Sequence, residues 1–378
     1  MKAKDFVQFA SKMIVSGLPF CVEAEPGVGK TELCKVAAKL AEKELGKIDL
    51  IISHPTVRSP IDYGGIPAKV REATAKSDAV WNFVPIGDLW KLVNAKKPTV
   101  CFIDDIGHAT PAVQAALMQL ILARQIGENM VSDHVRFIAA TNRAQDKAGV
   151  HPMLEPVKSR FTTIVHLDPD VESWVEWAAT CEDVGLLNVQ EAMPAVVTAY
   201  IAWKGHSALF AFQPKPGLEN TPVPRTVHHV GQMLAAGAIT ESTAFEVITG
   251  AVGKGWAIEF LSFLKTWAQL PDAEEVIDDP DILDALQFDH YVWDEQRGEV
   301  VSKGHTSISG RPDIGMAIVT KVAEIVKPSQ MDGFVRLLSK FTKPVEVLGM
   351  LLLRQRDSKF QETPAFIRWA SQNNSYIM

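Results

Sequence analysis

The sequence predicts an α/β fold in which a parallel sheet flanked by helices is followed by an all-α domain and a mainly helical C-terminal extension. Three observations indicate this arrangement. Short β-branched runs alternate with longer helical patterns through the first 166 residues, which is typical of a parallel sheet covered by helices. From about Asp168 the strand pattern fades and helical patterns dominate. The length of 378 residues exceeds what one hydrophobic core usually serves, so we expect more than one domain.

We divide the chain into an α/β core at residues 1–167, a helical domain at 168–268 and an extension at 269–378. Thr110-Pro111 predicts a helix start, because the threonine hydroxyl caps the helix and proline suits its first position. Residues 212–225 hold four prolines and are expected to be mostly loop. The expected strands of the core are Phe20–Glu23, Leu50–His54, Thr99–Asp104, Val135–Ala140 and Thr163–Leu167.

The extension opens with an acidic stretch, residues 271–289, which holds eight acidic residues and no basic one. We interpret this stretch as a solvated connector rather than a docking site, since runs of like charge are usually solvated. Residues 290–308 favour a hairpin, and helical patterns run from Met316 to the end. Thr363-Pro364 repeats the Thr-Pro helix start. We expect partner specificity to lie in this extension.

Composition and charge narrow the classes of function. A net charge of −7 gives no support to a nucleic-acid partner, so we expect protein partners. No apolar run reaches the roughly 18 residues that span a bilayer, and the first residues predict an amphipathic helix rather than a signal peptide. The cysteines Cys21, Cys34, Cys101 and Cys181 lack metal or redox spacing. We expect Cys21 and Cys101 to be buried thiols, which suits a reducing cytoplasm.

The stretch EPGVGKTE, residues 25–32, follows an expected strand and opens an expected helix, which is the context of a phosphate-binding loop. Gly27 and Gly29 let the backbone approach phosphates, while successive N–H groups and the helix N-terminus attract their charge. Ala24 stands where the pattern G-x-x-x-x-G-K-[ST] has its first glycine, and it is tolerable there if its φ is negative. The residues expected to bind the nucleotide are Glu25, Pro26, Gly27, Val28, Gly29, Lys30, Thr31 and Glu32.

Two further expected strands end in polar side chains. TVCFIDD ends in Asp104 and Asp105, and RFIAATN ends in Asn142. In a parallel sheet these residues emerge at the carboxyl edge beside the loop, where ligands bind in such folds. We expect Thr31 and Asp104 to hold Mg²⁺ and Asn142 to orient a water molecule against the γ-phosphate.

Two arginines complete the candidate site. Charge that develops on a transferred phosphoryl group is stabilised by a guanidinium, which a neighbouring subunit often supplies. Arg160, in EPVKSRFTTIVHL, precedes the last expected strand of the core. Arg225, in TPVPRTVHHV, begins an expected helix of the second segment. Arg136 and Arg143 are rivals by position.

The order of these motifs resembles AAA+ ATPases, and within them most resembles the MoxR group. The strongest match is FIDDIGHATPAVQAALMQLILARQI, and EPGVGKTEL, AATN, PVKSRF and PVPRT stand in the family's order. The resemblance covers roughly residues 1–260 and implies an ATPase that binds ATP and Mg²⁺. It implies Walker A roles for Lys30 and Thr31, Walker B for Asp104, sensor 1 for Asn142, the arginine finger for Arg160 and sensor 2 for Arg225.

The resemblance also implies partners. The family forms rings, usually hexamers, and typically works beside a protein with a von Willebrand A domain to mature or activate another protein. One departure concerns catalysis: the family usually ends Walker B with Asp-Glu, and the glutamate polarises the attacking water, whereas this chain has Asp105. The carboxylate is one methylene shorter, and a misplacement of about an ångström can cost on the order of a hundredfold in rate.

The motifs and the composition are compatible with three functions. The first is an ATP-driven ring that remodels a partner protein. The second is an ATP-gated scaffold that assembles but scarcely hydrolyses ATP, because of Asp105. The third is a nucleic-acid motor, which the acidic balance and the lack of basic clusters with interleaved aromatics disfavour.

Weaker patterns concern two connectors and a pair of histidines. Residues 54–87 form a long connector in which Tyr63 could grip a polypeptide as a mobile aromatic or be an ordinary buried tyrosine. Residues 123–137 favour a hairpin before the Asn142 strand. His228 and His229 have no third metal ligand nearby, so we interpret them as ordinary helix residues.

Overall fold

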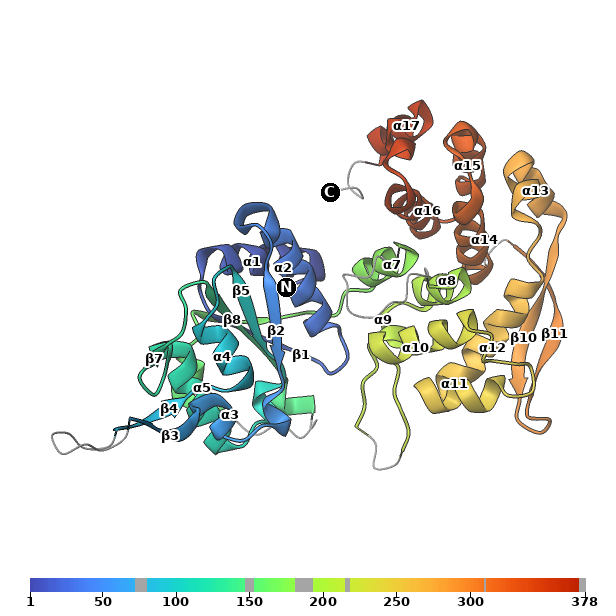
Figure 1. Cartoon of the computed structure of the whole chain (residues 1–378). Coiled ribbons are helices and arrows are strands. Elements are labelled where there is room, and N and C mark those ends of the chain that lie inside the picture. The colour runs from blue at the N-terminus through green and yellow to red at the C-terminus, as the bar shows by residue number, and fades with distance from the viewer. Residues whose placement is uncertain (72–79, 147–152, 181–192, 215–217, 309–310, 374–378) are drawn as a thin grey trace, which may run out of the picture. The chain divides into compact units, whose positions relative to one another are not determined.

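The computed structural model describes residues 1–71, 80–146, 153–180, 193–214, 218–308 and 311–373. The chain divides into two compact units, Met1–Pro169 and Asp170–Met378 (Figure 1). The first unit contains the expected α/β core. The second contains both the expected helical domain and the extension. Cys181 lies outside the described residues.

The first unit is built on a five-stranded parallel sheet with the strand order β2-β5-β8-β1-β9. All the expected strands of the core are confirmed, and their ends differ from expectation by one or two residues. The strand β8 continues to Asn142, two residues beyond the expected end, because it stays paired with β1 to that point. The strands are β1 Phe20–Ala24, β2 Asp49–Ser53, β5 Thr99–Ile103, β8 Val135–Asn142 and β9 Thr163–His166.

Helices cover both faces of this sheet (Figure 1). Successive side chains of a strand point to opposite faces, so Phe20 packs with α1 (Ala3–Ser16) and α2 (Lys30–Leu45), whereas Cys21 packs with α5 (Pro111–Ala123) and α4 (Gly87–Val93). Thr110 caps α5 by accepting a hydrogen bond from the backbone N–H of Val113, as expected for the Thr-Pro start.

Cys21 and Cys101 are buried in the sheet, as expected. Burial raises the pKa of each of these two thiols to about 12, because a buried thiolate loses its hydration. Both are therefore inert core residues at neutral pH.

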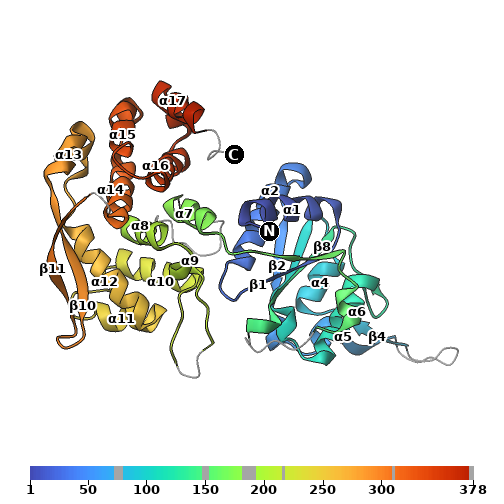
Figure 2. The ribbon, with the colours of Figure 1, turned by 180° about the vertical axis from the view of Figure 1, so that it is seen from behind.

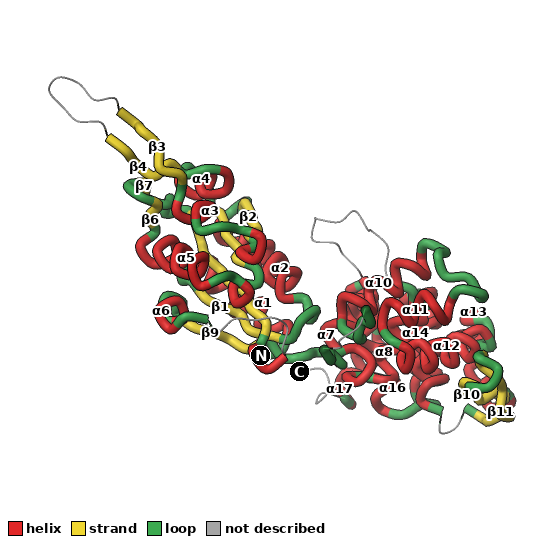
Figure 3. Tube along the Cα trace, turned by 90° about the horizontal axis from the view of Figure 1, so that it is seen from below, coloured by secondary structure: helices red, strands yellow, loops and turns green. Residues whose placement is uncertain are grey.

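The connector after β2 folds into η1 (Pro55–Val57), α3 (Ile61–Gly64) and an antiparallel hairpin of β3 (Ile66–Arg71) and β4 (Val80–Val84). This hairpin projects from one end of the first unit (Figure 3). Tyr63 is 5% exposed, and its hydroxyl lies 2.7 Å from Ser53 Oγ. The structure therefore supports the buried tyrosine over the mobile aromatic. The exposed aromatics of this segment are Trp81 and Phe83.

The smaller elements of the first unit lie in its loops. The expected hairpin before β8 is confirmed as β6 and β7, which pair in antiparallel fashion. It packs beside the first hairpin, where Asn129 Nδ2 donates to the carbonyl of Phe83 over 2.9 Å. These elements are β6 Gln125–Ile126, β7 Asn129–Met130, η2 Ile106–His108, η3 Ala144–Asp146 and α6 Glu155–Lys158.

The described residues of the second unit are mainly helical and include one two-stranded antiparallel hairpin. The hairpin confirms the expectation for residues 290–308 and packs against α12 (Figure 2). Its strands are β10 Gln287–Asp294 and β11 Glu299–Ser307, and the helices are α7 Val171–Thr180, α8 Ala195–Lys204, α9 His206–Leu209, α10 Pro224–Ala235, α11 Ala244–Val252, α12 Lys254–Ala268, α13 Ala273–Asp278, η4 Pro280–Ala285, α14 Pro312–Ile325, η5 Pro328–Gln330, α15 Met331–Leu338, α16 Lys343–Arg356, η6 Ser358–Glu362 and α17 Pro364–Gln372. None of the described helices is long and apolar enough to cross a membrane.

The acidic stretch is a folded part of the second unit, and most of its acidic side chains are exposed to solvent, as expected. It forms α13 and η4, and α13 packs against α14 and α15 through its buried Val276 and Ile277. Lys340 Nζ lies 2.7 Å from Asp281 Oδ1 and 2.8 Å from Asp284 Oδ2. Lys340 stands 56 positions after Asp284. The ion pairs could therefore not be predicted from the acidic stretch alone.

The two parts of the second unit are packed together. The helix α14 of the extension packs against α8 of the expected helical domain, and α16 packs against α7. At the end of the chain, Thr363 Oγ1 accepts a hydrogen bond from the backbone N–H of Phe366, so the second Thr-Pro helix start is confirmed.

Candidate nucleotide-binding site

The loop between β1 and α2 has the backbone of a phosphate-binding loop. The strand β1 ends at Ala24 and α2 begins at Lys30. Gly27 and Gly29 have φ of +76° and +94°, a region that side chains with a Cβ rarely adopt. Among the described non-glycine residues, positive φ occurs only at two positions elsewhere, so Ala24 has the negative φ that makes it tolerable.

The sheet register brings three predicted residues to this loop. Ala24 pairs with Asn142 across β1 and β8. Asp104 and Asp105 directly follow β5, which is the neighbour of β8 on its other side. The backbone N–H of Asp104 donates to the carbonyl of Ser53 over 2.8 Å, which fixes the point where the chain leaves the sheet.

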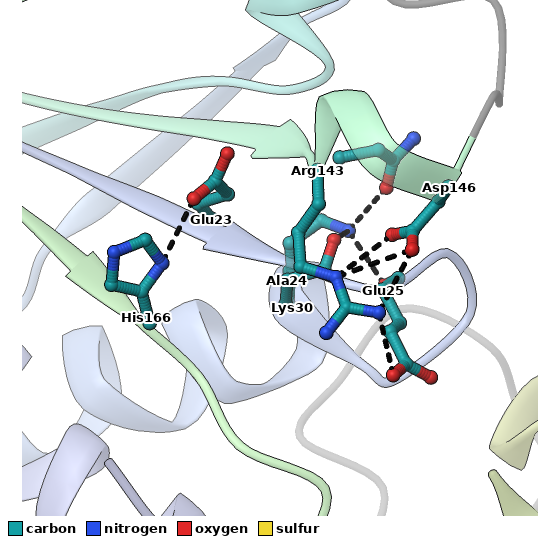
Figure 4. Close-up of polar contacts among 8 residues, drawn as sticks. Glu23, Ala24, Glu25, Lys30, Arg143, Asp146 and His166 are labelled. Carbon is teal, nitrogen blue, oxygen red and sulfur yellow. Dashed lines mark hydrogen bonds and ion pairs between the residues drawn. The ribbon is translucent and has the colours of Figure 1, made fainter.

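The Lys30 ammonium joins the loop to the end of β8. Its Nζ donates to Asn142 Oδ1 over 2.5 Å. It also donates to the carbonyl of Glu25 over 3.0 Å (Figure 4). The carbonyl of Ala24 lies 3.4 Å away. Lys30 is 7% exposed, and a buried cation needs such acceptors around it.

Thr31 and Asp104 form the pair of oxygens that could hold a divalent cation. Thr31 Oγ1 donates to Asp104 Oδ2 over 2.8 Å. A hydroxyl and a carboxylate are hard oxygen ligands of the kind that Mg²⁺ prefers, alongside water and phosphate. The two residues therefore fit the predicted cation.

Asp105 adopts an unusual backbone conformation, with φ +55° and ψ +42°. In this left-handed region Asp and Asn are much better tolerated than longer side chains. Asp105 Oδ1 accepts a hydrogen bond from Asn142 Nδ2 over 3.3 Å. Asn142 thus links Lys30 through its oxygen and Asp105 through its nitrogen.

Arg143 contacts the loop in a way that the sequence did not indicate. Its Nη2 lies 2.7 Å from Glu25 Oε1 and 2.8 Å from Asp146 Oδ1. Hydrogen bonds to Asp146 and the charge of Glu25 raise the pKa of the guanidinium. The sequence signal was limited to the position of Arg143 directly after Asn142, which ranked it only as a rival of Arg160.

The two predicted arginines lie in different units, Arg160 in the first and Arg225 in the second. Arg160 lies between α6 and β9, and its buried Nε has no hydrogen-bond partner among the described residues. Arg225 is exposed near the start of α10, in the second unit. On the same helix the His228 ring lies 5.3 Å from the Trp177 ring, so it serves packing.

Comparison with known proteins identifies the first unit. Residues 19–161 match the family model described as AAA domain (dynein-related subfamily), and this segment is an AAA domain with the P-loop fold of AAA+ proteins. A search of curated proteins finds no match. The MoxR group is narrower than this family model and stays a prediction.

Solved structures with similarity to the chain include the RuvB Holliday junction branch migration motor of Thermotoga maritima. It is 15% identical, with 74% of this chain and 74% of that chain covered and a TM-score of 0.36. NtrX from Brucella abortus in complex with ATP is 12% identical, with 75% and 60% covered and a TM-score of 0.38.

Proposed function

Because residues 19–161 form an AAA domain, we propose that this protein binds ATP with Mg²⁺ at residues 25–32 and hydrolyses it to ADP and phosphate. The observation that supports this most is the set of contacts at the sheet edge, where Lys30 bonds to Asn142 and Thr31 bonds to Asp104. The loop N–H groups and Lys30 would hold the phosphates, and Thr31 and Asp104 would hold Mg²⁺. When bound, that ion neutralises charge on the phosphate oxygens.

The proposed chemistry at the γ-phosphate uses two further residues. Asn142 orients the attacking water with its amide, and Asp105 accepts a proton from that water. A positioned carboxylate of this kind contributes about 10²- to 10⁴-fold as a general base. The hydrogen bond between Asn142 and Asp105 keeps the two groups within reach of one water molecule.

We further propose a MoxR-like ring, in which the protein remodels or activates a partner protein together with a von Willebrand A domain protein. In this ring, a hexamer in our proposal, Arg160 reaches the nucleotide of the neighbouring subunit and Arg225 acts from a lid at residues 168–268. Residues 269–378 would then be the part that selects the partner. The motif order from EPGVGKTEL to PVPRT supports this proposal.

The second candidate is an ATP-gated scaffold with little hydrolysis. It is favoured by Asp105, which has a shorter side chain than the usual glutamate and a left-handed backbone that suits aspartate. The rate of ATP hydrolysis distinguishes the ATPase from the scaffold.

The test is steady-state phosphate release with Mg-ATP, followed over a wide range of protein concentration. Turnover per subunit that rises steeply with concentration supports an ATPase whose sites are completed by assembly. Near-zero turnover together with tight ATP binding supports the scaffold. Lys30→Ala is the control, and we expect it to abolish binding in a nucleotide titration because the phosphates lose their point charge. Unchanged affinity in this variant would contradict the site assignment.

A further inference from the structure

Arg143, Glu25 and Asp146 form a charged network at the edge of the candidate site (Figure 4). From it we infer that Arg143 is a positioning residue, which holds the phosphate loop in its binding conformation through Glu25. The inference rests on the proposed function, since it concerns nucleotide affinity.

The Arg143 guanidinium is held by Asp146, which lies three residues later in the chain. Arg143 Nε donates to Asp146 Oδ2 over 3.0 Å, and Nη2 donates to Asp146 Oδ1 over 2.8 Å. Two parallel bonds of this type set the plane of the guanidinium as well as its position. The Asp146 side chain is 8% exposed, so this anchor is protected from water.

From this anchor the same Nη2 donates to Glu25 Oε1 over 2.7 Å. The side chains of Arg143 and Glu25 are 29% and 16% exposed, so water screens the pair only in part. A surface pair would contribute little, but a half-buried pair with one anchored partner loses less entropy when it forms.

Glu25 is held on two sides. Arg143 binds its carboxylate, and Lys30 Nζ donates to its backbone carbonyl over 3.0 Å. Lys30 also donates to Asn142, the residue before Arg143. Two adjacent residues at the end of β8 are therefore bridged to the start of the loop, and the position of Glu25 is coupled to the position of the Lys30 ammonium.

This coupling matters because the loop needs two glycines in left-handed conformations, at positions 27 and 29. Glycine loses more backbone freedom on ordering than any other residue. A loop that is already ordered binds with a smaller entropic cost. Loss of the Arg143–Glu25 bridge should therefore weaken nucleotide binding, although Arg143 lies outside the proposed nucleotide contacts and Glu25 belongs to them through the backbone of the loop.

The test is a double-mutant cycle on ADP affinity, measured by calorimetric titration of the full chain. We expect Arg143→Ala and Glu25→Ala each to weaken affinity about tenfold, in line with the usual strength of a charge-assisted hydrogen bond. The double variant should be no weaker than either single variant, because one bridge is lost in all three. Arg143→Lys should fall between, since lysine keeps the charge but not the fork.

The matched control is Arg136→Ala in β8, the strand that Arg143 directly follows. Arg136 donates to the carbonyls of Asp133 and Ile14 at the opposite end of β8, so its loss should leave ADP affinity unchanged. If Arg143→Ala does not fold, by circular dichroism and thermal melting, the cycle is run with Arg143→Lys and Glu25→Gln.

Additive losses in the cycle would overturn the inference, because Arg143 would then act on the nucleotide directly or at another place. Unchanged affinity in Arg143→Ala would overturn it as well. If the unsubstituted chain binds ADP and the cycle is additive, only this inference fails. If the unsubstituted chain does not bind ADP, the proposed function fails with it.

Discussion

Asp105 combines a short carboxylate with a backbone that suits a short side chain. Its φ of +55° lies in the left-handed region, which costs most L-residues roughly 1–2 kcal/mol and costs Asp and Asn less. The hydrogen bond from Asn142 also depends on where the aspartate oxygen lies. The backbone and the side chain at this position therefore favour the same residue type.

We expect Asp105→Asn to lower kcat about a hundredfold or more, because the amide cannot accept a proton as a general base. The substitution keeps the left-handed backbone, so ATP affinity should not change. Asp105→Glu should lower kcat as well, since the longer side chain strains the backbone and moves the carboxylate. Phosphate release and ATP titration measure both effects. A rise in kcat for Asp105→Glu would show that the short side chain, not the backbone, limits the rate.

At the level of single residues, the sequence predicted the grouping of Lys30, Thr31, Asp104 and Asn142. This was possible because parallel strands end at one edge of a sheet, so strand-end residues meet there whatever their separation in sequence. The bridge from Arg143 to Glu25 was not predictable, since it joins residues 118 positions apart through side-chain directions that no periodicity encodes. The left-handed backbone of Asp105 was not predictable either, because no sequence pattern indicated it.

At the scale of elements, sequence patterns predicted correctly those features that depend on neighbouring residues. The Thr-Pro helix starts and the hairpins depend on nearby residues, and the structure confirms them. That the acidic stretch folds into helices was not predicted, because its packing depends on residues that are distant in sequence. Lys340, just after α15, neutralises Asp281 and lowers the pKa of that carboxyl through a hydrogen bond.

The helices of the extension meet at Gly349, which α16 presents to α14 and α15. A Cβ added there would lie 2.7 Å from Leu338 Cδ2, 2.8 Å from Val319 Cγ1 and 3.1 Å from Phe334 Cζ. All three neighbours are buried, with exposures of 1% or less. Their side chains therefore have little room to turn away from a methyl group.

We expect Gly349→Ala to lower the free energy of unfolding by about 1–3 kcal/mol, the usual cost of overpacking a core. Gly250→Ala is the matched control, because a Cβ at that helical glycine meets nothing within 4 Å. It should stabilise the chain by about 0.5–1 kcal/mol, since alanine suits a helix better than glycine. Urea denaturation of both variants measures the difference. Equal effects of the two substitutions would show that the three helices do not pack tightly at Gly349.

At the scale of the whole molecule, the main question is which subunit Arg160 serves. Within the described first unit, no hydrogen bond or ion pair joins Arg160 to the phosphate loop of the same chain. Arg160 Nε is buried without a hydrogen-bond partner in the described part of the chain, and buried polar groups are nearly always satisfied. In the proposed ring, Arg160 acts instead on the nucleotide of a neighbouring subunit. The proposed ring therefore differs in a measurable way from a site that one chain completes alone.

Two inactive variants should restore activity when they are mixed. Arg160→Ala keeps its nucleotide loop and lacks the arginine, whereas Lys30→Ala keeps the arginine and lacks the loop lysine. In an equal mixture that assembles at random with independent sites, half of the loops are intact and half of those face an intact arginine. Turnover per subunit should therefore reach about a quarter of that of the unsubstituted chain, because the arginine acts in trans. Phosphate release by each variant alone and by the mixture measures this, and a mixture that forms mixed assemblies without activity would exclude the trans role of Arg160.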